Sequence, residues 1–363
     1  MAYLPLSTAN LPDPAINPAQ GSNPEDYFNT VLYTGNGGTN RSITGMNFQA
    51  DFLWHKDRSA SRNHSLVDVI RGTNDLQSNA NAAERSMPSF VSFDSDGFTV
   101  TQDGSTNPNW NENSITKVVW GWKANGSGST IAAGSIDGTN PTIASQVSAN
   151  TESGFSIVTF TGTGSNETVG HGLSSAPDCI LFLRRDTSGS DHKVYHSALG
   201  ATQNLRLNNT DAARTQSDFF NDTEPTTSVF SIGGARFASS STNVSYCFHS
   251  VEGFSKCSNY LGNGSADGSF IYTGFRPSFL IIKATGLNEG WIMYDTKRNS
   301  YNLSSTVITA EEASGDATNA VYGIDILSNG FKCRYNWNGV NGSGQNYIYM
   351  AFAENPFKFS LAR

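Results

Sequence analysis

The stretch "FTGTGSNETVGHGLSSAPDCILFLRRD", residues 160–186, decides the fold because the chain repeats its pattern. Related stretches are "YTGNGGTNRSITGMNFQADFLWHKD" at residues 33–57 and "YLGNGSADGSFIYTGFRPSFLIIK" at residues 260–283. Each begins with an aromatic residue, passes through a glycine turn and enters an apolar segment behind "QADF", "APDC" or "RPSF". Internal repeats set the organisation of a whole chain. We therefore interpret the sequence as three copies of one unit.

Each copy also ends on a strand in which aromatic residues alternate with others. These closing strands read "VVWGW" at 118–122, "VSYCFH" at 244–249 and "YIYMAF" at 347–352. Short strands rich in aromatic and β-branched residues, separated by Gly, Asn and Asp turns, are typical of β-sandwiches. The sequence predicts an all-β fold of three tandem β-sandwich domains of a lectin-like or jelly-roll-like kind.

The repeats set the expected domain boundaries. We expect an arm at residues 1–26, repeat 1 at 27–124, a Gly/Ser-rich connection at 125–150, repeat 2 at 151–250 and repeat 3 at 251–363. The first 26 residues contain five prolines, which lack the N–H that helices and sheet ladders need. We predict an extended N-terminal arm, either a disordered terminus or a docking strap that orders on a partner through Tyr3, Leu4, Leu6 and Leu11.

The composition disfavours several classes of protein. A net charge of -8 argues against a phosphate-binding surface, so we expect no nucleic-acid partner. No apolar run is long enough to cross a membrane, and the first residues show neither the basic nor the apolar part of a signal peptide. The four cysteines have no metal-binding spacing, so we expect free thiols that fill the core.

No motif favours catalysis. The glycines of "GTGSNETVGHG" are not followed by the Lys-Ser/Thr of a phosphate loop, and no Gly-x-Ser-x-Gly elbow is present. His192 and His196 share strand spacing, but a third ligand is not visible. We predict a non-enzymatic protein without a cofactor or a metal site.

Two tryptophans in polar loops are the candidate ligand-binding residues. Trp110 in "NPNWNEN" and Trp337 in "YNWNGVNGSG" each precede the closing strand of their repeat. An aromatic face can stack on a sugar ring while neighbouring amides bind its hydroxyls. The sequence thus offers a glycan site at Trp110, Trp337, Asn336 and Asn338, with folded-back loop anchors as the alternative.

A resemblance to a known family covers residues 27–359 and is carried by four stretches: "DYFNTVLYTGNG", "VSANTESGFSIVTFTGTGSNETVGHGLSSAPD", "VEGFSKCSNYLGNGSADGSFIYTGFRPSFLIIK" and "IYMAFAENPFK". The parts "GNGSADG" and "AFAENPFK" are the most specific. With them the chain resembles virion proteins of tailed phages of marine cyanobacteria, which carry tandem copies of a domain of unknown function. The resemblance implies a tail-fibre-like or baseplate-like structural protein, assembled in the host cytoplasm and located in the virion. It implies other virion proteins as partners of the arm and host surface polysaccharide as a possible ligand.

Other assignments stay open at this point. A capsid decoration or head-fibre protein and a free carbohydrate-binding module both fit the repeats. We expect a homo-oligomer, with a trimer as one option, although no coiled-coil heptad is present to join three chains. Tandem sandwiches could extend a rod or multiply weak binding sites.

Overall fold

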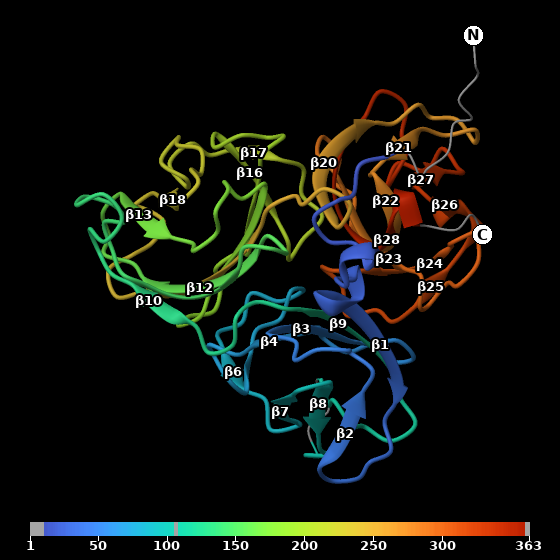
Figure 1. Ribbon diagram of the computed structural model, residues 1–363, viewed down its shortest axis with the longest axis horizontal. Helices are drawn as coiled ribbons and strands as arrows, with labels where there is room; N and C mark the ends of the chain where they lie inside the picture. Colours follow the sequence, from blue (N-terminus) through green and yellow to red (C-terminus); the bar gives the residue numbers. More distant parts are fainter. Residues whose placement is uncertain (1–10, 105–107, 360–363) are drawn as a thin grey trace.

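The molecule consists of antiparallel β-sheets joined by turns and short 3-10 helices, arranged as three lobes around a common centre (Figure 1). This computed structural model describes residues 11–104 and 108–359. The prediction of an all-β fold is confirmed.

A main sheet with one recurring strand order forms the inner part of each lobe. In every repeat the first strand pairs with the last, the last with the second, and the second with the third. These strands are β1 (Phe28–Thr34), β9 (Thr116–Trp122), β3 (Phe52–Asp57) and β4 (Ser65–Asp68) in repeat 1; β12 (Phe155–Thr161), β19 (Thr242–Phe248), β14 (Cys179–Arg184) and β15 (Lys193–His196) in repeat 2; and β20 (Ser255–Leu261), β28 (Asn346–Pro356), β22 (Phe275–Ala284) and β23 (Trp291–Asp295) in repeat 3.

Shorter strands extend the main sheets and build a small outer sheet in each lobe. The extensions are β5 (Asn74–Asp75) with β6 (Arg85–Ser86), β16 (Gln203–Arg206) with β17 (Arg214–Thr215), and β24 (Thr306–Thr309) with β25 (Ala317–Thr318). The outer sheets are β2 (Arg41–Thr44), β8 (Gly97–Val100) and β7 (Phe90–Asp94); β13 (Glu167–Gly170) and β18 (Val229–Ile232); and β21 (Phe270–Tyr272), β27 (Gly330–Cys333) and β26 (Ile324–Leu327).

The three main sheets share one hydrophobic core at the centre of the molecule. At its middle, Trp122, Phe248 and Phe352 occupy equivalent positions in their closing strands and contact one another, with ring centroids 5.5 to 6.2 Å apart. The opposite face of each main sheet packs on the outer sheet of its own lobe, in three further clusters. Because both faces are covered, the central strands contain continuous apolar runs, such as residues 179–183 of β14.

Equivalent hydrogen bonds join the repeats in a closed ring. The strand register aligns His64, His192 and Trp291 at the start of the third strand, and each donates a ring N–H to a main-chain carbonyl of another repeat. The acceptors Gln77, Arg206 and Thr309 are also equivalent to one another, because each lies next to the residue that pairs with the third strand at Leu66, Val194 or Met293. The bonds are His64 Nε2 to Thr309 O at 3.1 Å, His192 Nε2 to Gln77 O at 2.9 Å, and Trp291 Nε1 to Arg206 O at 2.7 Å.

Buried charges reinforce the same contacts. The Arg71 guanidinium pairs with Asp68 inside repeat 1 and also donates to the Tyr246 hydroxyl of repeat 2, at 2.8 Å. Tyr246 in turn donates to Asp68 at 2.9 Å. A shared core with buried polar bonds does not allow the rod of separate tandem domains that the sequence suggested as one option. The repeats form one closed unit.

The predicted Gly/Ser-rich connection at residues 125–150 takes part in a sheet. It contains the hairpin β10 (Ser129–Ile131) and β11 (Ser145–Asn150), and β11 pairs with the edge of β12. With these strands the main sheet of repeat 2 has eight strands, against four in repeat 1 and six in repeat 3.

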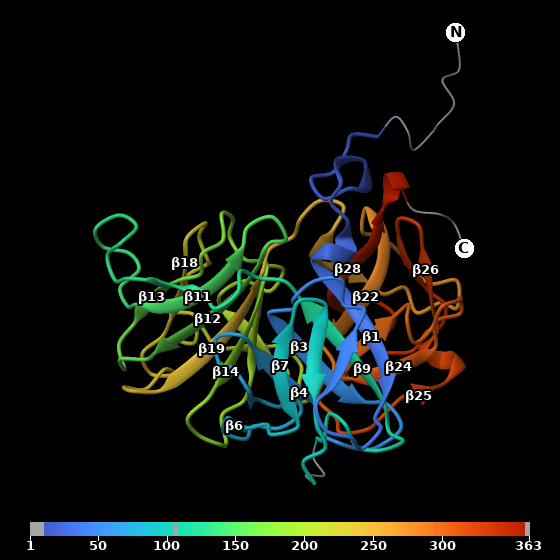
Figure 2. The same ribbon diagram turned by 60° about the horizontal axis from the view of Figure 1, so that its bottom comes forward.

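The described part of the predicted N-terminal arm lies against its own chain. It contains η2 (Pro18–Gln20) and η3 (Pro24–Asp26), and Figure 2 shows it above β1 and β28. Ile16 is fully buried in the shared core, and Asp13 pairs with Lys358 at 2.7 Å. From Asp13 onward this segment is therefore a folded strap, which corrects the expectation of an extended arm over residues 13–26.

Candidate functional site

The repeated glycine turn holds the loop that precedes the last strand of a repeat. In repeat 1 the Asn111 amide donates to Asn36 Oδ1 at 2.9 Å, and the Gly37 N–H donates to the Asn111 carbonyl at 3.0 Å. A Cβ on Gly35 would lie 2.0 Å from the Glu112 carbonyl oxygen, so only glycine fits there. Asn341 holds the turn at Asn263 in the same way in repeat 3. The turn thus clamps the loop that precedes the closing strand.

This clamp shows that the two loop tryptophans are not equivalent. The N–H of the second glycine in each turn donates to a main-chain carbonyl, that of Asn111, Phe237 or Asn341. These three acceptor residues are therefore equivalent. The residues that precede them, Trp110, Arg236 and Val340, are equivalent as well. Trp337 lies three residues earlier in its loop and aligns with Gly233 of repeat 2, because the equivalent turn bonds end on Gly233 O and Trp337 O. Similar polar surroundings in the sequence concealed this offset.

Trp110 is part of the core of repeat 1. Its side chain is completely buried, stacks on His55 with ring centroids 4.4 Å apart and donates from Nε1 to Ser65 Oγ at 3.2 Å. A sugar therefore cannot reach either face of the Trp110 ring. The prediction of a glycan site at Trp110 is therefore wrong, and the alternative of a folded-back loop anchor is the correct one.

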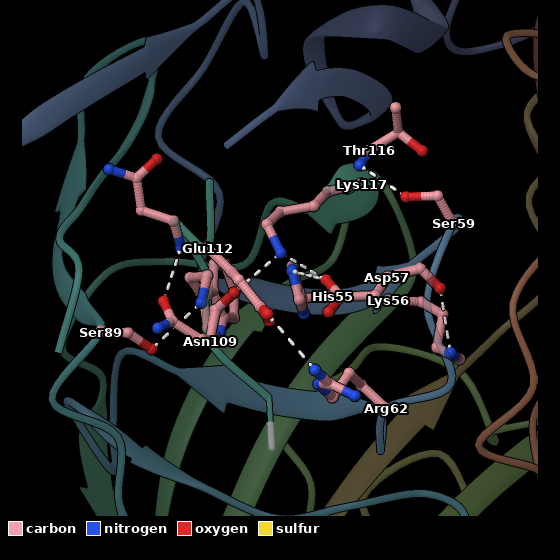
Figure 3. A network of polar contacts seen from close by, with 12 residues as sticks. His55, Lys56, Asp57, Ser59, Arg62, Ser89, Asn109, Glu112, Thr116 and Lys117 are labelled. Carbon is pink, nitrogen blue, oxygen red and sulfur yellow. Dashed lines mark hydrogen bonds and ion pairs between the residues drawn. The ribbon is translucent and has the colours of Figure 1, made fainter. Parts of the chain in front are cut away.

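A polar network, buried at Lys117 and Asp57, fixes the loop that carries Asn109 and Glu112 (Figure 3). Lys117 Nζ pairs with Asp57 and also donates to the Asn109 carbonyl at 2.7 Å, while Glu112 pairs with Arg62 at 3.3 Å. Burial raises the pKa of Asp57 and lowers the pKa of Lys117, and their mutual attraction opposes both shifts. A charged pair that holds a main-chain carbonyl gives this network a structural role.

In repeat 2 the equivalent place is an open cleft of about 340 Å³. It lies over Phe182 and Lys193, the cross-strand pair that corresponds to His55 and Ser65 beneath Trp110. Its lining is basic, with Arg184, Lys193, Arg206 and Arg236 beside Asp191. These cations already have carboxylate partners among Asp186, Asp191, Asp211 and Asp218.

In repeat 3 the same place is a cleft of about 290 Å³ that contains Trp337. Its ring lies 4.7 Å from that of Tyr322, with the planes inclined at 51°. Tyr322 occupies the position of the buried Phe219 in repeat 2, since each donates its N–H to the third residue before it, Asn319 or Gln216. Both aromatic residues are partly exposed. Glu289, Glu311 and Glu312 also line this cleft.

The other predicted site residues have mixed outcomes. Asn336 and Asn338 are exposed, but neither lines the cleft, and the Asn338 carbonyl accepts a hydrogen bond from the Tyr347 hydroxyl at 2.7 Å. Leu11 is 39% exposed and borders a cleft of about 440 Å³ beside Tyr272. Tyr3, Leu4 and Leu6 lie outside the described residues.

The cysteines lie in the core as expected. All four, Cys179, Cys247, Cys257 and Cys333, are buried and free. Burial raises the pKa of each thiol, which favours the uncharged form of a core side chain. Among the described residues, no helix has the length and apolar character needed to span a membrane.

The comparisons with known proteins give one match. Neither a curated protein nor a solved structure matches this chain. One family model, described as a domain of unknown function (DUF7483), matches residues 23–356 in a single continuous span. That span includes the strands of all three repeats, which also contribute residues to the shared core. The chain therefore belongs to the family of the domain of unknown function DUF7483.

Proposed function

We propose that this protein is a non-enzymatic structural protein of a phage virion, associated with the tail, and that it contacts glycans on the host surface. The virion assignment rests on the resemblance of "GNGSADG", "AFAENPFK" and the repeat 2 motif to phage virion proteins. In this proposal the protein is assembled in the host cytoplasm and located in the virion, where other virion proteins are its partners.

The observation that carries the glycan contact is the cleft with Tyr322 and Trp337. Partly exposed aromatic rings beside an open cavity suit the stacking of a sugar ring. In repeat 2 Gly233 stands at the position of Trp337, and in repeat 1 the buried Trp110 ring lies over the equivalent part of the sheet. Repeat 3 is therefore the lobe that we assign to host contact.

A capsid decoration protein is the second candidate, and one specific observation favours it. The shared core makes the three repeats one compact unit, and such a unit suits a position on a surface or a baseplate better than the shaft of a long fibre. On this alternative, Trp337 is an ordinary loop anchor.

Immunogold electron microscopy of the intact virion separates the candidates. An antibody raised against residues 27–363 should place gold at the tail if the proposal holds. Gold over the capsid would support decoration instead. Absence of gold from particles that contain all their known proteins would contradict a virion role.

A further inference from the structure

We infer that the repeat 3 cleft selects sugars that carry no anionic group, with neutral or amine-bearing hexose units as its ligands. This inference rests on the proposed glycan contact and names the class of saccharide. Two features of the cleft carry it: an aromatic pair with unused polar atoms, and carboxylates that outnumber the one cation near them.

The aromatic pair leaves its polar atoms available. Within the described residues, neither the Tyr322 hydroxyl nor Trp337 Nε1 makes a hydrogen bond, although the main chain of both residues is fixed. The Tyr322 carbonyl accepts from the Tyr294 hydroxyl at 2.7 Å, and Trp337 O accepts from Val340 and Asn341. A rigid backbone thus presents two rings and two hydrogen-bonding groups to the cleft.

The carboxylates make the cleft acidic. Glu289, Glu311 and Glu312 form no close ion pair within the described part of the chain, and of their carboxylates only that of Glu311 accepts a hydrogen bond, from the Trp291 N–H at 2.9 Å. The nearby Lys283 ammonium attracts Glu289 and Glu311, but it donates its hydrogen bonds to the main-chain carbonyls of Thr210, Leu287 and Glu289. One nearby cation thus stands against three carboxylates. Carboxylate oxygens accept hydrogen bonds from hydroxyl and ammonium groups, whereas they repel sulfate, phosphate and uronate groups.

The equivalent cleft of repeat 2 supports selection by charge. The positions of Ile292, Thr309 and Val340 in repeat 3 are occupied in repeat 2 by the basic residues Lys193, Arg206 and Arg236. One site of the fold therefore has a basic lining in repeat 2 and an acidic lining in repeat 3. The basic groups of repeat 2 are already paired with carboxylates, whereas the three carboxylates of repeat 3 outnumber the one cation near them.

The experiment compares three probes on the full chain by isothermal titration calorimetry. The probes are oligomers of N-acetylglucosamine, of glucosamine and of galacturonate, which are neutral, cationic and anionic. The variants are Trp337→Ala, Tyr322→Ala and Glu312→Gln, with Tyr301→Ala as the matched control because Tyr301 is 82% exposed and lies outside the cleft. Circular dichroism confirms that each variant is folded.

We expect binding of a neutral or cationic probe, weakened about tenfold by Trp337→Ala or Tyr322→Ala and unchanged by Tyr301→Ala. Glu312→Gln should weaken the cationic probe about threefold and leave the neutral one unchanged. Galacturonate binding that is lost on Trp337→Ala would overturn the charge selection while leaving the glycan contact intact. If no probe binds and Trp337→Ala phage adsorbs normally to its host, both the inference and the glycan contact fail.

Discussion

Trp291 Nε1 donates a 2.7 Å hydrogen bond to the Arg206 carbonyl, which ties the third repeat to the second. The equivalent bonds of His64 and His192 tie the first repeat to the third and the second to the first. A ring of this kind closes only when all three repeats are folded. In an isolated repeat these donors would face water instead of their partners, so each bond contributes its net stabilisation of about 0.5 to 1.5 kcal/mol only when the ring is closed.

Removal of both Lys117 and Asp57 should lower the free energy of unfolding much less than removal of Lys117 alone. Replacement of Lys117 by Met leaves the Asp57 carboxylate buried without its cation, so we expect a loss of about 3 to 5 kcal/mol in the free energy of unfolding. The double variant with Asp57→Leu should recover most of this loss. Urea unfolding of the single and double variants measures both values, and additive losses would contradict the account.

Acid should destabilise the protein through two buried histidines. Burial lowers the pKa of His171 and of His196 from 6.5 to about 4. The unfolded chain therefore binds protons first as the pH falls, so the stability from these groups is complete above pH 6.5 and is lost between pH 6.5 and 4, by roughly 3 kcal/mol for each.

The slope of the unfolding free energy against pH checks this prediction. His196→Gln should flatten the slope between pH 6.5 and 4, whatever its effect on stability at neutral pH. An unchanged slope in this variant would show that His196 does not titrate as proposed.

The glycine turn of repeat 1 should not tolerate a side chain. A Cβ on Gly35 would meet the Glu112 carbonyl oxygen at 2.0 Å, so Gly35→Ala must displace the loop that carries Trp110, at a cost of about 1 to 3 kcal/mol or more. Gly286→Ala is the matched control, because the atom nearest to a Cβ there is Gln345 Oε1 at 3.6 Å, an ordinary van der Waals contact. Equal thermal midpoints for the two variants would be inconsistent with the clamp.

The two tryptophans should respond differently to truncation. Trp110→Ala removes a fully buried ring from the core of repeat 1 and should cost about 3 to 5 kcal/mol, without affecting saccharide binding. Trp337→Ala removes a partly exposed ring and should cost less stability but impair binding. Parallel calorimetry and binding assays compare them. A binding defect in a folded Trp110→Ala protein would reopen a ligand role for that loop.

The sequence allowed the fold class and the repeats to be predicted because turn chemistry and strand patterns are local. The apolar run at residues 179–182 and the alternating residues 118–122 indicate buried strands, and the structure has strands at Cys179–Arg184 and Thr116–Trp122. The shared core could not be predicted, since a strand buried on both faces has the same pattern whether its second face meets an outer sheet or another repeat. Trp122, Phe248 and Phe352 meet only through packing in three dimensions.

The candidate site was predicted only in part. Trp337 lies in an open cleft, as a ligand-binding residue should. The sequence does not indicate its partner Tyr322, because Tyr322 follows the short strand β25 and two further strands separate it from the Trp337 loop. The sequence does not distinguish Trp110 from Trp337 because both loops are polar, yet Asn109 and Asn111 are buried and Asn111 holds the Trp110 loop in place. Polarity in the sequence does not separate an amide that faces solvent from one that satisfies a buried turn.

Differential scanning calorimetry of the full chain tests the central claim, that the three repeats are one closed unit. Because the core around Trp122, Phe248 and Phe352 and the ring of hydrogen bonds need all three repeats, we expect one transition with equal calorimetric and van't Hoff enthalpies. Two or three separable transitions, each with the enthalpy of about a hundred residues, would mean that the repeats fold independently and would contradict the account.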